Sequence, residues 1–191
     1  MNKMQVEILV EERSMEFFLR GVLPSLLPEG ISLDENCFIR AHEGKQHLQK
    51  EIPPKVRAYQ HYSIPTKVII IQDQDSSDCK EVKQKLAALV NENSTLPSLV
   101  RIACRELEAW YLGDMDALEK AYPHFKAERH RNRAKFRDPD TCNASDELRK
   151  IIPDFQKSTA ARRMPSEMDF SKNRSGSFQH LVKGLKSFLS Q

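Results

Sequence analysis

The sequence predicts an α/β protein in which a mostly parallel, four-stranded sheet is flanked by helices. Short apolar runs rich in β-branched residues alternate with amphipathic stretches along the first 114 residues. Residues 68–71 place four β-branched side chains in a row, which is typical of a strand buried on both faces. Alternating strands and helices imply parallel pairing with helices on both sides of the sheet.

The first half of this pattern is read from residue 6 onward. A strand is expected at 6–10, and the helix after it is expected to begin at Ser14 as its N-cap. Residues 31–39 alternate loosely and predict the second strand. A short helix follows, and the Pro53-Pro54 pair is expected to break it before a further turn that runs to residue 62.

The second half contains the apolar strand at 67–71, an amphipathic helix, a shorter strand at 99–103 and a helix from 107 to 112. We therefore expect a core at 1–114 and a helical, basic extension at 115–191 that packs on this core in one domain. Within the extension, residues 126–140 are expected to be irregular, and helices are expected at 146–152, 158–164 and about 175–189.

Composition excludes several classes of protein. Of the residues, 39% are hydrophobic and 30% charged, so a solvated surface and a packed core are both expected, and a net charge of +3 is too small for a dedicated, strongly basic nucleic-acid binder. No run reaches the roughly 20 apolar residues of a membrane span, and no signal peptide is visible. The four cysteines form no Cys-x-x-Cys pair, which favours reduced packing residues in a cytoplasmic protein.

Two aspartates follow the apolar strand, in the order Asp73-Gln74-Asp75. Residues two apart on an extended backbone point the same way, so both side chains are expected to face one site at the carboxyl end of the strand. Open parallel sheets bind ligands there, and two carboxylates suit a hard cation such as Mg²⁺. The alternative is a turn that only caps the next helix.

Other acids fall at the ends of neighbouring strands. Glu11 follows the first strand directly, and Glu16 lies in the helix after it, where the helix dipole alone would also favour an acid. Glu106 and Glu108 follow the fourth strand; if both are helical they point about 200° apart, so that one faces a metal and the other a base. Trp110, just beyond them, is expected in the core. Carboxylates gathered this closely need a cation to offset their repulsion.

This arrangement of a Glu after the first strand and an Asp-x-Asp after a later one resembles the TOPRIM catalytic domain of topoisomerases, primases and nucleases of the overcoming-lysogenization-defect family. The fuller resemblance is to a small TOPRIM-like bacterial family, domain-of-unknown-function family 4276. It covers nearly the whole length and is carried by the residues Val-Glu-Ile-Leu-Val-Glu at 6–11, Asp-Gln-Asp at 73–75, Glu-Leu-Glu-Ala-Trp at 106–110, Phe-Arg-Asp-Pro at 136–139 and Asn-Arg-Ser-Gly-Ser-Phe at 173–178.

The resemblance implies a TOPRIM-like, Rossmann-like fold and a nuclease that depends on Mg²⁺ or Mn²⁺, often found beside an AAA- or ABC-type ATPase and linked to antiviral defence against phage. Glu11, Asp73 and Asp75 would be catalytic and would hold one ion, while Glu16 and Glu106 or Glu108 would help to hold a second. Two ions about 4 Å apart clamp the attacking and leaving oxygens of a phosphodiester. One departure is Glu12, where TOPRIM domains usually place Gly.

Basic residues in the extension are expected to bind the phosphates of DNA or RNA, because Arg and Lys neutralise a nucleic-acid backbone. A solvated loop or a docking face for an acidic partner is the alternative. The residues concerned are Lys126, Arg129, Arg131, Arg133, Lys135, Arg137, Lys172 and Arg174, with Arg162 and Arg163 as further candidates.

Four other functions are weighed against the nuclease. A non-catalytic module would use the same sheet to dock nucleic acid or an ATPase, and Glu12 favours it. A haloacid-dehalogenase-type phosphatase normally carries its Asp-x-Asp on the first strand, and a nucleotide-sugar glycosyltransferase would be longer. A P-loop ATPase is disfavoured because no Gly-x-x-x-x-Gly-Lys-Ser/Thr run is present among only six glycines.

Overall fold

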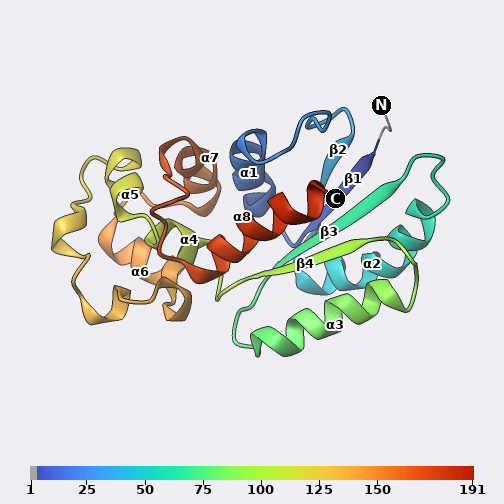
Figure 1. Cartoon of the computed structure of the whole chain (residues 1–191). Helices are drawn as coiled ribbons and strands as arrows, with labels where there is room; N and C mark the ends of the chain where they lie inside the picture. The colour runs from blue at the N-terminus through green and yellow to red at the C-terminus, as the bar shows by residue number, and fades with distance from the viewer. Residues whose placement is uncertain (1–3) are drawn as a thin grey trace.

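A computed structural model describes residues 4–191 and confirms the predicted α/β fold with a parallel sheet (Figure 1). The strand order is β2-β1-β3-β4, and every neighbouring pair is parallel. Val10 pairs with Ala41 on one side and Ile71 on the other, so the carboxyl ends of the strands lie along one edge of the sheet. The strands are β1 (Gln5–Val10), β2 (Cys37–Ala41), β3 (Thr66–Asp73) and β4 (Ser98–Ala103).

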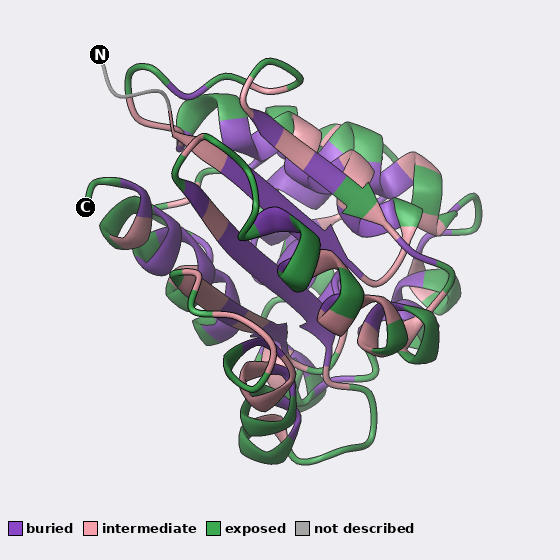
Figure 2. Ribbon diagram, turned by 90° about the vertical axis from the view of Figure 1, so that its right-hand side faces the viewer, coloured by how far each residue is buried: buried purple, intermediate pink, exposed green. Residues whose placement is uncertain are grey.

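Helices cover both faces of the sheet, as the alternating pattern predicts (Figure 1). Leu9 and Ile70 point into a core beneath two helices, α2 and α3, whereas Ile8 and Ile69 point into a larger core on the opposite face. The central strands β1 and β3 are almost wholly buried in Figure 2, whereas the outer strands β2 and β4 are buried only in part. The helices of the first part are α1 (Arg13–Val22), α2 (Lys45–Tyr59), α3 (Cys79–Asn91) and α4 (Glu108–Leu112), with a 3₁₀ turn η1 (Leu23–Ser25) after α1.

The predicted break at Pro53-Pro54 is wrong, because α2 runs through both prolines as one helix. Leu48, Ile52 and Val56 recur every four residues and are fully buried against the sheet. The packing of this stripe outweighs the hydrogen bonds that two prolines cannot donate.

The predicted bounds of the second strand and the first helix also need correction. Strand β2 begins only at Cys37, since the side chain of Asn36 accepts a hydrogen bond from Ser32 N and donates one to Gly30 O, which folds the preceding residues into a loop. Helix α1 begins at Arg13, and its N-cap is Glu12 rather than Ser14.

The C-terminal part is helical, as predicted, and packs on the larger core. Helix α7 lies against α1, where a Cβ added at Gly21 would come within 2.3 Å of Pro165 Cβ, so the two backbones meet closely. Helix α8 packs against β4. The elements are α5 (Met115–Ala121), which was not predicted, η2 (Ala127–Arg129), η3 (Ala134–Phe136), η4 (Pro139–Thr141), α6 (Ala144–Ile151), α7 (Lys157–Glu167) and α8 (Gly176–Leu189).

In residues 4–191, no helix has the length and apolar character needed to cross a bilayer.

Candidate functional site

Glu11 and Asp73 meet at the carboxyl edge of the sheet. Glu11 directly follows β1, and Asp73 is the last residue of the adjacent strand β3. The backbone N–H of Asp73 donates a hydrogen bond of 3.2 Å to Glu11 Oε2. The structure therefore brings these two predicted residues together.

Asp73 is buried, with only 8% of its surface exposed. Its Oδ1 accepts a hydrogen bond of 3.1 Å from the backbone N–H of Leu107, which ties the end of β3 to the segment before α4. Burial raises the pKa of Asp73 well above its usual value, and the charges of Glu108 and Glu11 raise it further.

Asp75 is held at the site by a backbone conformation and contacts that the sequence did not predict. Its φ is +55°, so the backbone is left-handed rather than extended, and the two-residue spacing does not align it with Asp73. Its N–H donates to Arg105 O (2.8 Å), and its carboxylate pairs with Lys45 Nζ (2.7 Å). Burial first, and then the charge of Asp75, raise the pKa of Glu11 to about 7.

Glu106 and Glu108 both face Lys157, which contradicts the prediction that they point apart. Lys157 Nζ lies 3.6 Å from Glu106 Oε2 and 3.5 Å from Glu108 Oε2. The helical argument fails because α4 begins only at Glu108, so Glu106 lies outside the helix. Glu106 Oε1 also accepts a hydrogen bond of 2.8 Å from Ser145 N.

Glu108 is the most unusual of these acids. It is 1% exposed, and neither carboxyl oxygen has a hydrogen-bond partner within the described residues. Burial raises its pKa to about 7, and the ammonium of Lys157 partly opposes that rise. A buried carboxylate without hydrogen bonds is costly, and in this structure the ammonium of Lys157 supplies its charged partner.

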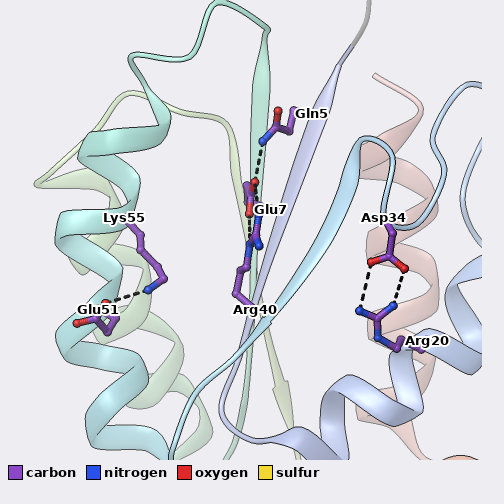
Figure 3. Close-up of polar contacts among 7 residues, drawn as sticks. All are labelled: Gln5, Glu7, Arg20, Asp34, Arg40, Glu51 and Lys55. Atoms are coloured by element: carbon purple, nitrogen blue, oxygen red, sulfur yellow. Dashed lines mark hydrogen bonds and ion pairs between the residues drawn. The ribbon is translucent and has the colours of Figure 1, made fainter.

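Glu7 shows how this chain satisfies a buried acid that has only a structural role. It is fully buried in the middle of β1, yet Gln5 donates to its Oε1 at 2.7 Å and Arg40 to its Oε2 at 3.0 Å (Figure 3). This contrast separates Glu7, whose hydrogen bonds are made, from Glu108, whose are not.

Glu16, also predicted as a metal ligand, is not brought into this group. It pairs with Arg20 at 3.0 Å, and Arg20 is in turn held by Asp34 (Figure 3). Glu16 lines a separate cavity that also contains His42 and His47.

Lys45 and Lys157 were not predicted from the sequence as residues of the site, and Glu12 was noted only as a departure from the TOPRIM pattern. Lys157 begins α7, about 50 residues beyond the acids it contacts, and no local pattern marks it. Glu12 lies close enough for its charge to raise the pKa of Asp73, Glu108 and Glu11. Its backbone is extended (φ −150°), so the Gly usual in TOPRIM domains is not required here by conformation.

We name Glu11, Glu12, Asp73, Asp75, Glu106 and Glu108 the acidic cluster. The atoms that it offers to a metal are all carboxylate oxygens, the ligand type that Mg²⁺ and Mn²⁺ prefer, and the two oxygens of Glu108, which accept no hydrogen bond within the described residues, fit such a role. In the described part of the chain, however, no three His, Cys, Asp or Glu side chains converge as a formed metal site, and Lys45 and Lys157 neutralise part of the charge.

Several bases predicted to bind nucleic acid are already paired within the chain. Lys126 lies 3.0 Å from Glu119, and Lys172 lies 3.3 Å from Asp169. Arg131 pairs with Asp116, Lys135 pairs with Glu147, and Arg174 donates to Phe136 O at 3.4 Å. In residues 4–191, Arg129, Arg133 and Arg137 form no ion pair.

Fold and site together define an α/β protein with a parallel sheet whose carboxyl edge carries a partly buried acidic cluster. The chain belongs to the family described as Domain of unknown function (DUF4276), whose model matches residues 10–186. Comparisons with curated proteins and with solved structures found no match.

The raised pKa values predict how stability depends on pH. Because the folded pKa of Glu11 and Glu108 is about 7, above the usual 4.5, the folded chain binds more protons than the unfolded chain between these values. Their stabilising contribution is complete below about pH 4.5 and is lost as pH rises through about 7. With a chelator present to remove metal ions, the melting temperature is expected to fall as the pH rises from about 4.5 to about 7.

Thermal unfolding followed by circular dichroism measures this fall. Glu108→Gln should flatten the profile, whereas Glu81→Gln, at an exposed position of α3, should leave it unchanged. Identical profiles for the wild type and Glu108→Gln would contradict the assignment.

Proposed function

We propose that this chain is a TOPRIM-type nuclease that hydrolyses phosphodiester bonds of DNA or RNA with Mg²⁺ or Mn²⁺. The observation that carries the proposal is the acidic cluster, in which Glu11 and Asp73 meet at adjacent strand ends and Glu108 is buried without a hydrogen bond. The TOPRIM-like motif supports it, because Glu11, Asp73 and Asp75 occupy the positions of that motif.

Glu11, Asp73 and Asp75 would hold one ion, and Glu106 and Glu108 would help to hold a second. The bound metal would polarise the phosphodiester and stabilise charge that develops on its oxygens. Glu16, paired elsewhere with Arg20, has no part in this proposal.

The chain's own residues would exchange partners when the site is loaded. Lys45 and Lys157 now neutralise Asp75 and the pair Glu106 and Glu108. With the carboxylates holding a divalent cation, these ammonium groups would be available to contact an anionic phosphodiester. Asp73 stays fixed by the N–H of Leu107, which orients its second oxygen.

A non-catalytic module that docks nucleic acid or an ATPase is the second candidate. The ion pairs of Lys45 and Lys157 favour it, because they already offset part of the acidic charge without any metal. The ATPase partner and the role in antiviral defence rest on the family resemblance and stay predictions.

Cleavage and metal binding, measured on the purified chain, distinguish the two candidates. Labelled single-stranded DNA, duplex DNA and RNA are incubated with Mg²⁺, Mn²⁺ or EDTA, and Mg²⁺ binding is followed by calorimetry. The nuclease predicts cleavage that requires the ion and stops in EDTA. If the chain neither cleaves nucleic acid nor binds metal at millimolar concentration, the docking module remains as the supported function.

A further inference from the structure

A cavity of about 490 Å³ opens beside the acidic cluster. Figure 1 shows α4 and α6 on the side of the sheet toward which the strand ends point. The cavity is lined by Asp75 and Glu106 of the cluster, and by three basic residues that come from three different segments. Arg105 precedes α4, Arg149 belongs to α6, and Lys157 begins α7.

We propose that this cavity binds a phosphate and the adjoining nucleotide of a single-stranded nucleic acid, with Arg105 and Arg149 as the phosphate ligands. The proposal rests on the proposed function and deepens it, since it names the strand type and the residues that hold it. It also places the main contact here rather than on the basic run at 126–137.

The chemistry of the lining supports an anionic ligand. The guanidinium of Arg105 is held by the side chain of Asn143, and Arg149 is exposed and lies 3.7 Å from an equally exposed Asp146. Ser145 lines the same cavity, and its buried hydroxyl has no hydrogen-bond partner within the described residues. One guanidinium group can donate two parallel hydrogen bonds to two oxygens of a phosphate, and a hydroxyl adds one more donor.

The charge of the lining depends on the neighbouring acids. Three basic and three acidic side chains line the cavity, so their formal charges cancel in the chain alone. Asp75 and Glu106 are the acids that a divalent cation would neutralise, and the three basic side chains would then dominate. Phosphate affinity is therefore expected to rise when the cation is added.

The size of the cavity favours a single strand. Its volume is within the range of small-ligand sites, roughly 300–1,000 Å³, and suits one nucleotide rather than the surface of a duplex. Glu108, 1% exposed, does not line the cavity, but it contacts Lys157, which does. A flexible strand or a chain end can enter a recess of this size, whereas a duplex would meet the basic run, where Lys126, Arg131 and Lys135 are already paired with acids.

Fluorescence anisotropy of a labelled single-stranded oligonucleotide tests the proposal without relying on cleavage. Binding is measured in EDTA and in Ca²⁺, for the wild type, for Arg105→Gln/Arg149→Gln and for the matched control Arg129→Gln/Arg133→Gln in the basic run. The cavity variant is expected to bind at least about tenfold more weakly in Ca²⁺, because two charge-assisted contacts are lost. The control should change much less, and a duplex should bind the wild type more weakly than the single strand.

Arg105→Lys/Arg149→Lys, which keeps the charge but loses the planar fork, should recover only part of the affinity. Both arginines are exposed, so the variants are expected to fold, and thermal unfolding verifies this. Wild-type affinity in the Gln variant, a larger loss in the control, or equal binding of duplex would overturn the proposal. If the wild type cleaves and the Gln variant still binds normally, the nuclease proposal stands and the cavity assignment fails. If binding depends on Arg105 and Arg149 but the wild type shows no cleavage, the cavity assignment stands and the nuclease proposal fails.

Discussion

Replacing Asp73 and Asp75 with asparagine is expected to abolish metal-dependent cleavage while the protein stays folded. Loss of an outer-shell partner of a metal ligand already costs roughly 10–100-fold, so removal of two charged ligands should cost more than about a hundredfold. Asparagine is preferable to alanine at position 73, because its amide oxygen still accepts the hydrogen bond from Leu107 N. Alanine would leave that buried N–H unpaired, at a cost of about 1–3 kcal/mol.

The measurement is the initial rate of cleavage in Mg²⁺, with calorimetry to follow the ion. A matched control, Asp34→Asn/Glu51→Gln, removes two acids that pair with Arg20 and Lys55 (Figure 3) and do not belong to the acidic cluster. The control should cleave at the wild-type rate. Unchanged activity in the Asp73 and Asp75 variant would rule out the proposed nuclease site.

Trp110→Ala is expected to lower the free energy of unfolding by about 3–5 kcal/mol, the usual cost of deleting a large buried aromatic side chain. Trp110 is fully buried, as expected from the sequence, and its ring lies 5.4 Å from that of Phe18 and 5.6 Å from that of Phe178. Its Nε1 donates to Ser177 Oγ at 2.8 Å, and the substitution would remove this hydrogen bond, while Ser177 Oγ keeps its bonds with Cys104 N and Asp140 Oδ1. A loss of this size is a large fraction of the stability of a typical domain.

Chemical denaturation with urea measures this loss through the midpoint of the transition. Trp110→Phe keeps most of the ring volume and should lose less than the alanine variant. Tyr62→Ala, at an exposed aromatic position, is the matched control and should change stability little. A Trp110→Ala chain as stable as the control would show that this core does not hold α4 in place.

The sequence predicted the parallel sheet and the buried middle of β3 because both depend on local pattern, although β3 ends at Asp73 rather than at the expected residue 71. Four β-branched residues in a row define the buried strand, and Asp73 necessarily follows at its tip. The continuity of α2 could not be read in the same way, since it depends on how Leu48 and Val56 pack against the sheet, which no local propensity for Pro53 contains.

The acidic cluster was predicted only in part, and the predicted part follows from the parallel topology of the sheet. Glu11 and Asp73 meet because adjacent parallel strands end at one edge, which is a rule of topology. The left-handed backbone of Asp75 and the contact of Lys157 with Glu108 depend on tertiary folding between distant segments. Spacing along the chain carries no signal for either of them.

The close contact between Gly21 and Pro165 joins helix α1 near the start of the chain to helix α7 in its C-terminal part. It sets how near α7 lies to α1, and α7 begins with Lys157. A fragment ending at residue 114 would retain every carboxylate of the edge but lose the ammonium that faces two of them. Such a fragment would expose an uncompensated anionic surface, so the segment after residue 114 is part of the working unit rather than an appendage that a minimal version could omit.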